Sequence, residues 1–371
     1  MSNLKALVER IDTHNDFNRI LNEYFVIIDA EWIIDPSVAV LLANKAIANP
    51  SGIRPELLIY TFLHASYVSG QHHLIFEYCR PLRTSPPPRA SSLRQFMMYC
   101  YEKPFMEQLL RQGWFSIDDA RFTCSRVTPK AVVMTACDDI YYHKYLIDEL
   151  ESLAVPADVV FHIAVIDASV TTLEHLRSRV ERHKWFSFSE HASDEYHRLV
   201  DHTHISSVEQ RVTLYACHRF FIAHAILNKY NVQVIVCDAD TDFAGCELQE
   251  AVNLACSSDA DVALAKWAND SSPGLAYTAD VMVFYPTINS MRFLSLVCRY
   301  LLFHIKSNLS FWTLDQVALN ATDKYMRTVA ESYQFLDLAT HPIKQRQLFR
   351  HKGSTQFRQE AALVHLNAHQ R

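Results

Sequence analysis

The stretch "VQVIVCDADTDF", residues 232–243, places a run of apolar side chains directly before three closely spaced carboxylates. A short run rich in Val and Ile is typical of a buried β-strand. Asp238, Asp240 and Asp242 then follow within five positions, where their like charges repel one another. A divalent cation, a phosphate chain bound through such a cation, or exposure to water would each offset that repulsion. The stretch therefore predicts a strand with an acidic tip.

Strands and helices alternate on both sides of this stretch, from about residue 126 onward. The alternation predicts an α/β fold with a largely parallel sheet covered by helices on both faces. In such sheets ligands bind beyond the carboxyl ends of the strands, which is where Asp138–Asp139, Asp167 and Asp238–Asp240 are expected. The predicted strands lie in "KAVVMTAC" (130–137), "ADVVFHIAVID" (157–167), "VQVIVC" (232–237) and "DVALAKW" (261–267), and the predicted helices in 141–153, 171–183, 207–230 and 248–258.

The first 120 residues are different in character, with helical patterns such as "DPSVAVLLANKAIANPSG" (35–52) and a proline-rich connector, "TSPPPRASS" (84–92). We therefore expect two domains: an all-α N-terminal domain over 1–120, which packs on the second domain or recruits an acceptor, and an α/β domain over 121–371. The N-terminal domain carries no catalytic pattern.

Composition excludes several classes of protein. The 35 basic and 41 acidic residues argue against a nucleic-acid partner, and the nine scattered cysteines form no CxxC pair. Only six glycines occur, no two of them close together, so neither a Rossmann glycine motif nor a P-loop is present. No signal peptide and no apolar stretch of spanning length is found, and we expect a cytoplasmic protein without a transmembrane segment. A peripheral contact with a membrane stays open.

Four kinds of site have closely spaced carboxylates of this sort. One is a solvated acidic loop. An EF-hand would need Gly and Glu where the chain has Phe243 and Gln249, so that kind is excluded. A phosphohydrolase with Asp238 as nucleophile usually has Thr or Val at the position of Asp242. In a nucleotide-sugar transferase, Asp238 and Asp240 would bind Mn²⁺ or Mg²⁺ and the metal would bind the diphosphate, because these ions prefer oxygen ligands.

Several motifs taken in order resemble the GT-A retaining glycosyltransferases of the glycogenin and bacterial lipooligosaccharide galactosyltransferase family. The resemblance covers roughly residues 130–355. The motifs are "ACDDIY" (136–141), "FHIAVIDA" (161–168), "YACHRFF" (215–221), "VIVCDADTDF" (234–243), "YTADVMVF" (277–284), "LDQVALN" (314–320) and "RHKGS" (350–354).

The resemblance implies a set of donor-binding residues. Asp138 would hydrogen-bond the uracil edge and Tyr141 would pack on the base, while Ile140 replaces a family asparagine. Arg219 would lie near the donor sugar and diphosphate, with a surface ion pair as the alternative. The implied metal ligands are Asp238, Asp240 and His351, with His341 as a second choice for the histidine.

The resemblance also implies residues at the reacting sugar. Asp315 and Gln316 would lie near the sugar hydroxyls, although Asp315 could instead cap a helix. Asp280 stands in "TAD" where the family has Asn-Ala-Gly, which alters the sugar or acceptor pocket. The family's Lys-Pro-Trp is missing, and Lys352 or Arg358 are candidates to neutralise the leaving diphosphate.

The function implied is metal-dependent transfer of a sugar from a UDP-sugar to an acceptor hydroxyl, with retained anomeric configuration. The acceptor would be a glycan, a lipid-linked sugar or a protein. Two alternatives stay open: a degenerate, non-catalytic nucleotide-sugar-binding protein, and the phosphohydrolase that uses Asp238.

Overall fold

The computed structural model describes residues 129–192, 208–243, 247–266, 276–306, 314–346 and 348–349. Closer to the N-terminus it describes helix α3 (Pro36–Ala48) and the short pieces 7–9, 18–20, 23, 61, 106–107 and 109–111. Most of the expected N-terminal domain, the connector at 84–92 and the candidates His351, Lys352 and Arg358 lie outside the described residues. The domain boundary near residue 120 therefore stays a prediction.

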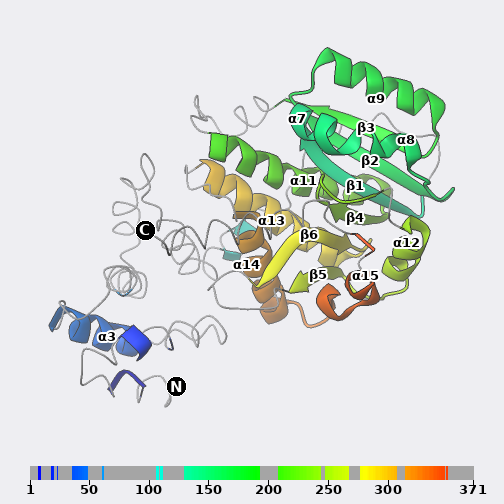
Figure 1. Cartoon of the computed structure of the whole chain (residues 1–371). Helices are drawn as coiled ribbons and strands as arrows, with labels where there is room; N and C mark the ends of the chain where they lie inside the picture. Colours follow the sequence, from blue (N-terminus) through cyan, green and yellow to red (C-terminus); the bar gives the residue numbers. More distant parts are fainter. Residues whose placement is uncertain are drawn as a thin grey trace, which may run out of the picture.

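The described residues form a seven-stranded sheet in the order β3-β2-β1-β4-β6-β5-β7 (Figure 1). The sheet is mostly parallel, and β6 is the strand that runs antiparallel to both its neighbours, β4 and β5. This confirms the expected α/β class. The strands are β1 (Ala131–Asp138), β2 (Val159–Ile166), β3 (Phe186–His191), β4 (Gln233–Cys237), β5 (Val262–Lys266), β6 (Tyr277–Phe284) and β7 (Phe335–Asp337).

Helices cover both faces of the sheet, as the alternation of elements requires. One face packs against the long helices α11 (Val208–Tyr230), α13 (Ile288–Lys306) and α14 (Leu314–Val329). The other face packs against smaller elements: the π-helical turn η3 (Tyr142–Leu146), α8 (Glu149–Ser152), α9 (Val170–Arg182), α12 (Leu248–Cys256) and α15 (Pro342–Gln345). Two further short elements are α7 (Asp139–Tyr141) and η4 (Leu338–Thr340).

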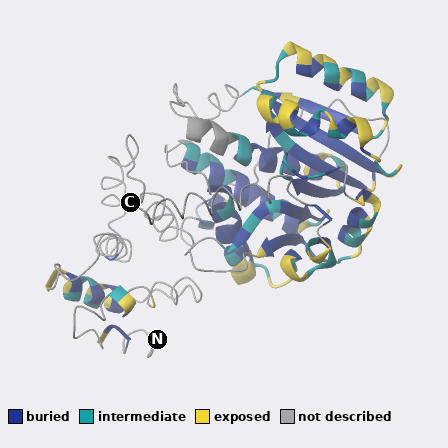
Figure 2. Cartoon of the chain, in the orientation of Figure 1, coloured by how far each residue is buried: buried dark blue, intermediate teal, exposed yellow. Residues whose placement is uncertain are grey.

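Alternation along the strands separates two hydrophobic cores. In β1, Val132 and Met134 belong to the core under the long helices, whereas Ala131 and Val133 belong to the opposite core. Successive side chains of a strand point to opposite faces, so a strand covered on both faces is apolar throughout. Figure 2 shows the result: the strands are buried, and exposed residues gather on helices such as α9 and α12.

One N-terminal segment joins the first of these cores. Met106 and Leu109 are buried in the cluster that α11, α13 and α14 form with the sheet. Part of the expected helical region therefore packs directly against the α/β domain. Among the helices that the structure describes, none combines the length and hydropathy needed to cross a bilayer.

Candidate functional site

The strand ends bring the predicted aspartates to one edge of the sheet. Strand β1 ends at Asp138, and β4 ends at Cys237, directly before Asp238. The two strands are adjacent and parallel, so their carboxyl ends lie at the same edge. The predicted placement of the aspartates at this edge is confirmed.

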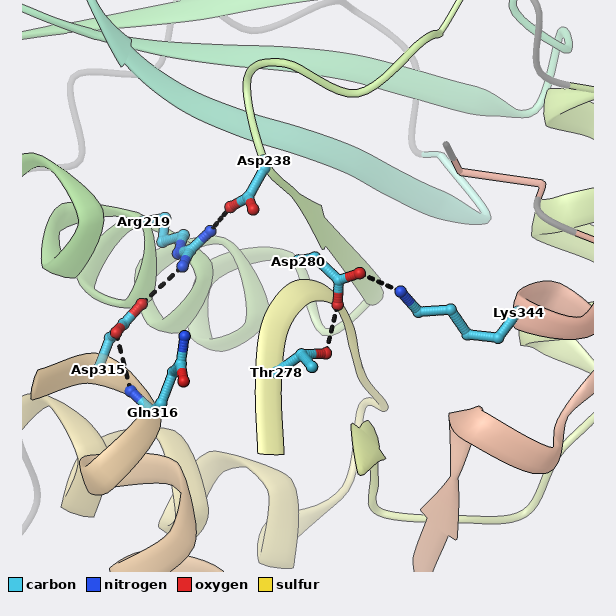
Figure 3. A network of polar contacts seen from close by, with 7 residues as sticks. All are labelled: Arg219, Asp238, Thr278, Asp280, Asp315, Gln316 and Lys344. Carbon is cyan, nitrogen blue, oxygen red and sulfur yellow. Dashed lines mark hydrogen bonds and ion pairs between the residues drawn. The ribbon is translucent and has the colours of Figure 1, made fainter. Parts of the chain in front are cut away.

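Arg219 bridges two carboxylates at this edge. One of its guanidinium nitrogens donates to Asp238 Oδ1, and the other donates to Asp315 Oδ2 at 2.7 Å (Figure 3). Only 8% of the Arg219 side chain and 5% of the Asp315 side chain are exposed, against 31% for Asp238. The alternative of a surface ion pair for Arg219 is therefore wrong, because the side chain is buried.

The charges of this group act on one another. Burial alone would lower the pKa of Arg219, yet the neighbouring carboxylates of Asp238 and Asp315 raise it above its ordinary value. The guanidinium stays charged and offsets the negative charges of the buried Asp315 and the partly exposed Asp238. Its Nε is buried and has no hydrogen-bond acceptor among the residues that the structure describes. An oxygen of a ligand would satisfy that donor.

Asp315 makes two side-chain contacts at the start of α14. It lies in the first turn of α14, and its Oδ1 accepts the backbone N–H of Gln316 at 2.8 Å. Its second oxygen accepts from Arg219. In Figure 3 the Gln316 side chain points toward the Arg219 guanidinium. Asp315 thus ties the start of α14 to the acidic tip of β4.

Asp138 and Tyr141 occupy the end of the neighbouring strand. The backbone N–H of Tyr141 donates to Asp138 Oδ1 at 2.8 Å, so Asp138 caps the short helix α7. Tyr141 is 40% exposed. Burial raises the pKa of its hydroxyl, and Tyr145 and the carboxylate of Asp240 raise it further. Asp240 therefore lies close enough to Tyr141 to act on it electrostatically.

Asp280 lies directly beside Asp238 on the antiparallel strand β6. The backbone N–H of Asp238 donates to the Asp280 carbonyl at 3.0 Å. The Asp280 carboxylate accepts a hydrogen bond from the Thr278 hydroxyl and forms an ion pair with Lys344 of α15 (Figure 3). The sequence reasoning did not name Lys344. Its partner is 64 positions away, so no local pattern connects the two.

The chemistry of the donor set partly supports a metal site. Asp238 and Asp240 supply carboxylate oxygens at a partly exposed strand end, which suits Mn²⁺ or Mg²⁺. The expected third ligand, His351, lies outside the described residues. Within the described part of the chain, no three His, Cys, Asp or Glu side chains are grouped so as to hold a metal ion. His341 caps α15, and its Nδ1 accepts the backbone N–H of Ile343 at 3.4 Å.

Comparison with known proteins found solved structures that are similar to part of this chain. No protein-family model matches the chain, and neither does any protein in a search of the curated proteins. Among the solved structures that are similar over part of the chain are three glycosyltransferases: apo bifunctional WbbM, GlyE from Streptococcus pneumoniae TIGR4, and apo mouse xyloside xylosyltransferase 1.

The extent of these likenesses is small. WbbM has a TM-score of 0.38 at 14% identity over 60% of this chain and 40% of WbbM. GlyE has a TM-score of 0.35 at 15% identity, over 57% of this chain and 46% of GlyE. The xylosyltransferase has a TM-score of 0.34 at 13% identity, over 57% of this chain and 85% of the xylosyltransferase. The chain thus spans less than half the length of the WbbM and GlyE chains. Likeness at this level assigns no activity to the chain.

Proposed function

We propose that this chain is a metal-dependent GT-A glycosyltransferase that moves a sugar from a UDP-sugar to an acceptor hydroxyl. The observation that carries the proposal is the buried bridge from Asp238 through Arg219 to Asp315. It joins the acidic tip of β4 to the start of α14, two segments that the sequence resemblance names independently. A solvated acidic loop gives no reason for burying a guanidinium between two carboxylates, because burying charges costs several kcal/mol per ion, roughly.

The proposed donor site runs along the carboxyl edge of the sheet. Asp138 and Tyr141 would hold the uracil base, with the exposed Tyr141 ring packing on it. Asp238, Asp240 and His351 would hold Mn²⁺ or Mg²⁺ next to the diphosphate. When bound, the metal would stabilise the negative charge that grows on the leaving diphosphate.

The side chains themselves supply positioning and charge. Arg219 pairs with Asp238 and Asp315 and holds both carboxylates in place, so neither has to reorganise as charge develops. Asp315 and Gln316 would bind hydroxyls of the donor sugar. Asp315 is committed to Arg219 and to the Gln316 amide, and it would therefore position the sugar rather than attack it.

The reaction exchanges one bond at the anomeric carbon for another. The bond from that carbon to the diphosphate oxygen breaks, and its electron pair leaves with UDP. The acceptor oxygen bonds to the same carbon from the side of departure, which retains the configuration. The proton of the acceptor hydroxyl passes to the departing phosphate oxygen, so UDP and the glycosylated acceptor are the only products.

The domain arrangement belongs to the same proposal. Residues 121–371 would form the transferase domain, and residues 1–120 a helical domain that packs on it or recruits the acceptor. The buried positions of Met106 and Leu109 in the transferase core support a packing role for at least one segment. The acceptor would be a glycan, a lipid-linked sugar or a protein.

The test is release of UDP from a panel of UDP-sugars with Mn²⁺, by the full-length chain and by the Asp315→Asn variant. UDP release by the wild type that falls at least tenfold in the variant is the expected result. UDP binding without turnover on any donor would instead support the degenerate binding protein. A phosphoenzyme on Asp238, with release of inorganic phosphate, would support the phosphohydrolase.

A further inference from the structure

A second cation lies at the acidic edge, separate from Arg219. The Lys344 ammonium of α15 reaches the carboxylate of Asp280 on β6, and the Thr278 hydroxyl donates to the same carboxylate. About a quarter of the Lys344 side chain is exposed (23%), so the group is held in place and still accessible. Figure 3 shows the Asp280 group beside the Arg219 group.

The register of the sheet fixes where the carboxylate partner of Lys344 lies. Asp280 is hydrogen-bonded through its backbone carbonyl to the backbone N–H of Asp238, 3.0 Å away. The two carboxylates therefore come from adjacent positions on neighbouring strands, where like charges destabilise a sheet. Each carboxylate forms an ion pair with a different side chain: Asp238 pairs with Arg219, and Asp280 pairs with Lys344.

The two cations differ in what they can offer to a ligand. Both terminal nitrogens of Arg219 donate to carboxylates, and 8% of its side chain is exposed. Lys344 has three N–H donors on a flexible stem, and its ion pair with Asp280 needs only one of them. An ammonium anchored on one side can bind an anionic oxygen on the other.

We propose that Lys344 is the side chain that binds the diphosphate of the nucleotide-sugar, and that Asp280 and Thr278 position it. This inference rests on the proposed function, because it assigns the ligand of Lys344 within the same site. The ligand chemistry is a nucleoside diphosphate. Asp280 contributes as a positioning residue that orients the ammonium and offsets its charge while the site is without donor.

The experiment measures binding of UDP and of uridine to the full-length chain by calorimetry, with and without Mn²⁺. The variants are Lys344→Met, Lys344→Arg and the double variant Asp280→Asn/Lys344→Met. Loss of Lys344 is expected to weaken UDP binding roughly tenfold and to leave uridine binding unchanged, because a charged hydrogen bond to phosphate is lost. Lys344→Arg is expected to restore most of the affinity.

The double variant separates a lost ligand contact from an unpaired carboxylate. It removes both charges together, so the fold keeps no uncompensated Asp280, and the same loss of UDP affinity is expected. Arg346→Met is the matched control, since Arg346 follows α15 and pairs with Glu250 of α12 instead. Its UDP affinity should equal that of the wild type.

Two results would overturn the inference in different ways. If the wild type binds UDP and the Lys344 variants bind it equally well, or lose UDP and uridine alike, the role assigned to Lys344 is wrong and the proposed function stands. If the wild type has no affinity for UDP, the proposed function fails and the inference fails with it.

Discussion

The guanidinium of Arg219 donates a 2.7 Å hydrogen bond to the carboxylate of Asp315, although 96 positions separate the two residues. The bond joins the middle of α11 to the first turn of α14, and the second arm of the guanidinium reaches Asp238 beyond β4. Three elements that are distant in sequence therefore meet at one buried charge.

Arg219→Met should lower the free energy of unfolding by about 3–5 kcal/mol, because it leaves the buried Asp315 without its cation. Urea unfolding monitored by circular dichroism measures the loss. Arg346→Met breaks an ion pair whose arginine is 58% exposed, and its cost should stay below about 1 kcal/mol. Equal losses in the two variants would mean that the buried bridge does not stabilise the fold.

Asp240→Ala should abolish the Mn²⁺-dependent part of UDP binding and leave the thermal midpoint within a few degrees of the wild-type value. Asp240 is partly exposed, so removing its carboxylate costs the fold little. Asp242→Ala is the matched control two positions on, and it should retain metal-dependent binding. The metal assignment would be refuted by a D240A protein whose UDP affinity still responds to Mn²⁺ as the wild type does.

Tyr141→Ala should weaken UDP binding roughly tenfold, since stacking of a base on an aromatic ring contributes about 1–3 kcal/mol. Tyr141→Phe keeps the ring and should bind UDP with nearly wild-type affinity. Titration of each variant with UDP by intrinsic fluorescence measures the difference. A tenfold loss in the phenylalanine variant as well would assign the contribution to the hydroxyl instead of the ring.

The protein should lose stability as the pH falls from about 6.5 toward 4, the interval between ordinary and buried histidine pKa values. Burial lowers the pKa of His304 to about 4, and burial together with Arg299 lowers that of His224 to about 4. The unfolded chain binds protons at these side chains in that interval and the folded chain does not, so acid favours unfolding. Urea unfolding at pH 7 and pH 5 measures the effect.

His304→Gln serves as the test of that assignment. The histidine donates Nδ1–H to the Tyr300 carbonyl at 2.8 Å, and glutamine keeps an N–H donor without a titrating group. The difference in unfolding free energy between pH 7 and pH 5 should therefore shrink in this variant. An unchanged difference would mean that other groups cause the acid sensitivity.

Apolar runs were sufficient to predict the centre of the fold. Strands β1, β2 and β4 and helix α11 were predicted from their apolar side chains. Such side chains can be buried against any other apolar side chain, so no specific partner has to be known. Strand β3 was not predicted, because its Ser187 and Ser189 are buried polar residues that hydrogen-bond His162 of β2 at 2.8 and 3.0 Å. Their partner lies on another strand, and the local sequence "FSFSEH" (186–191) does not reveal it.

The candidate site likewise contains residues that the sequence predicted and residues that it did not. Asp138 and Asp238 were predictable because the end of a parallel strand places whatever residue follows it at the ligand-binding edge. The contacts Arg219–Asp315 and Lys344–Asp280 depend on where helices from distant segments pack on the sheet. The periodicity of the sequence does not predict those positions. Lys344 was missed for that reason, although it stands only three positions after the histidine considered as a ligand, His341.

Metal-dependent binding of UDP is tested most directly by calorimetric titration of the full-length wild-type chain with UDP, in buffer with Mn²⁺ and in buffer with EDTA. We expect saturable 1:1 binding in Mn²⁺ that weakens at least tenfold in EDTA. Affinity for UDP that is equal in the two buffers, or no binding in either, would contradict it.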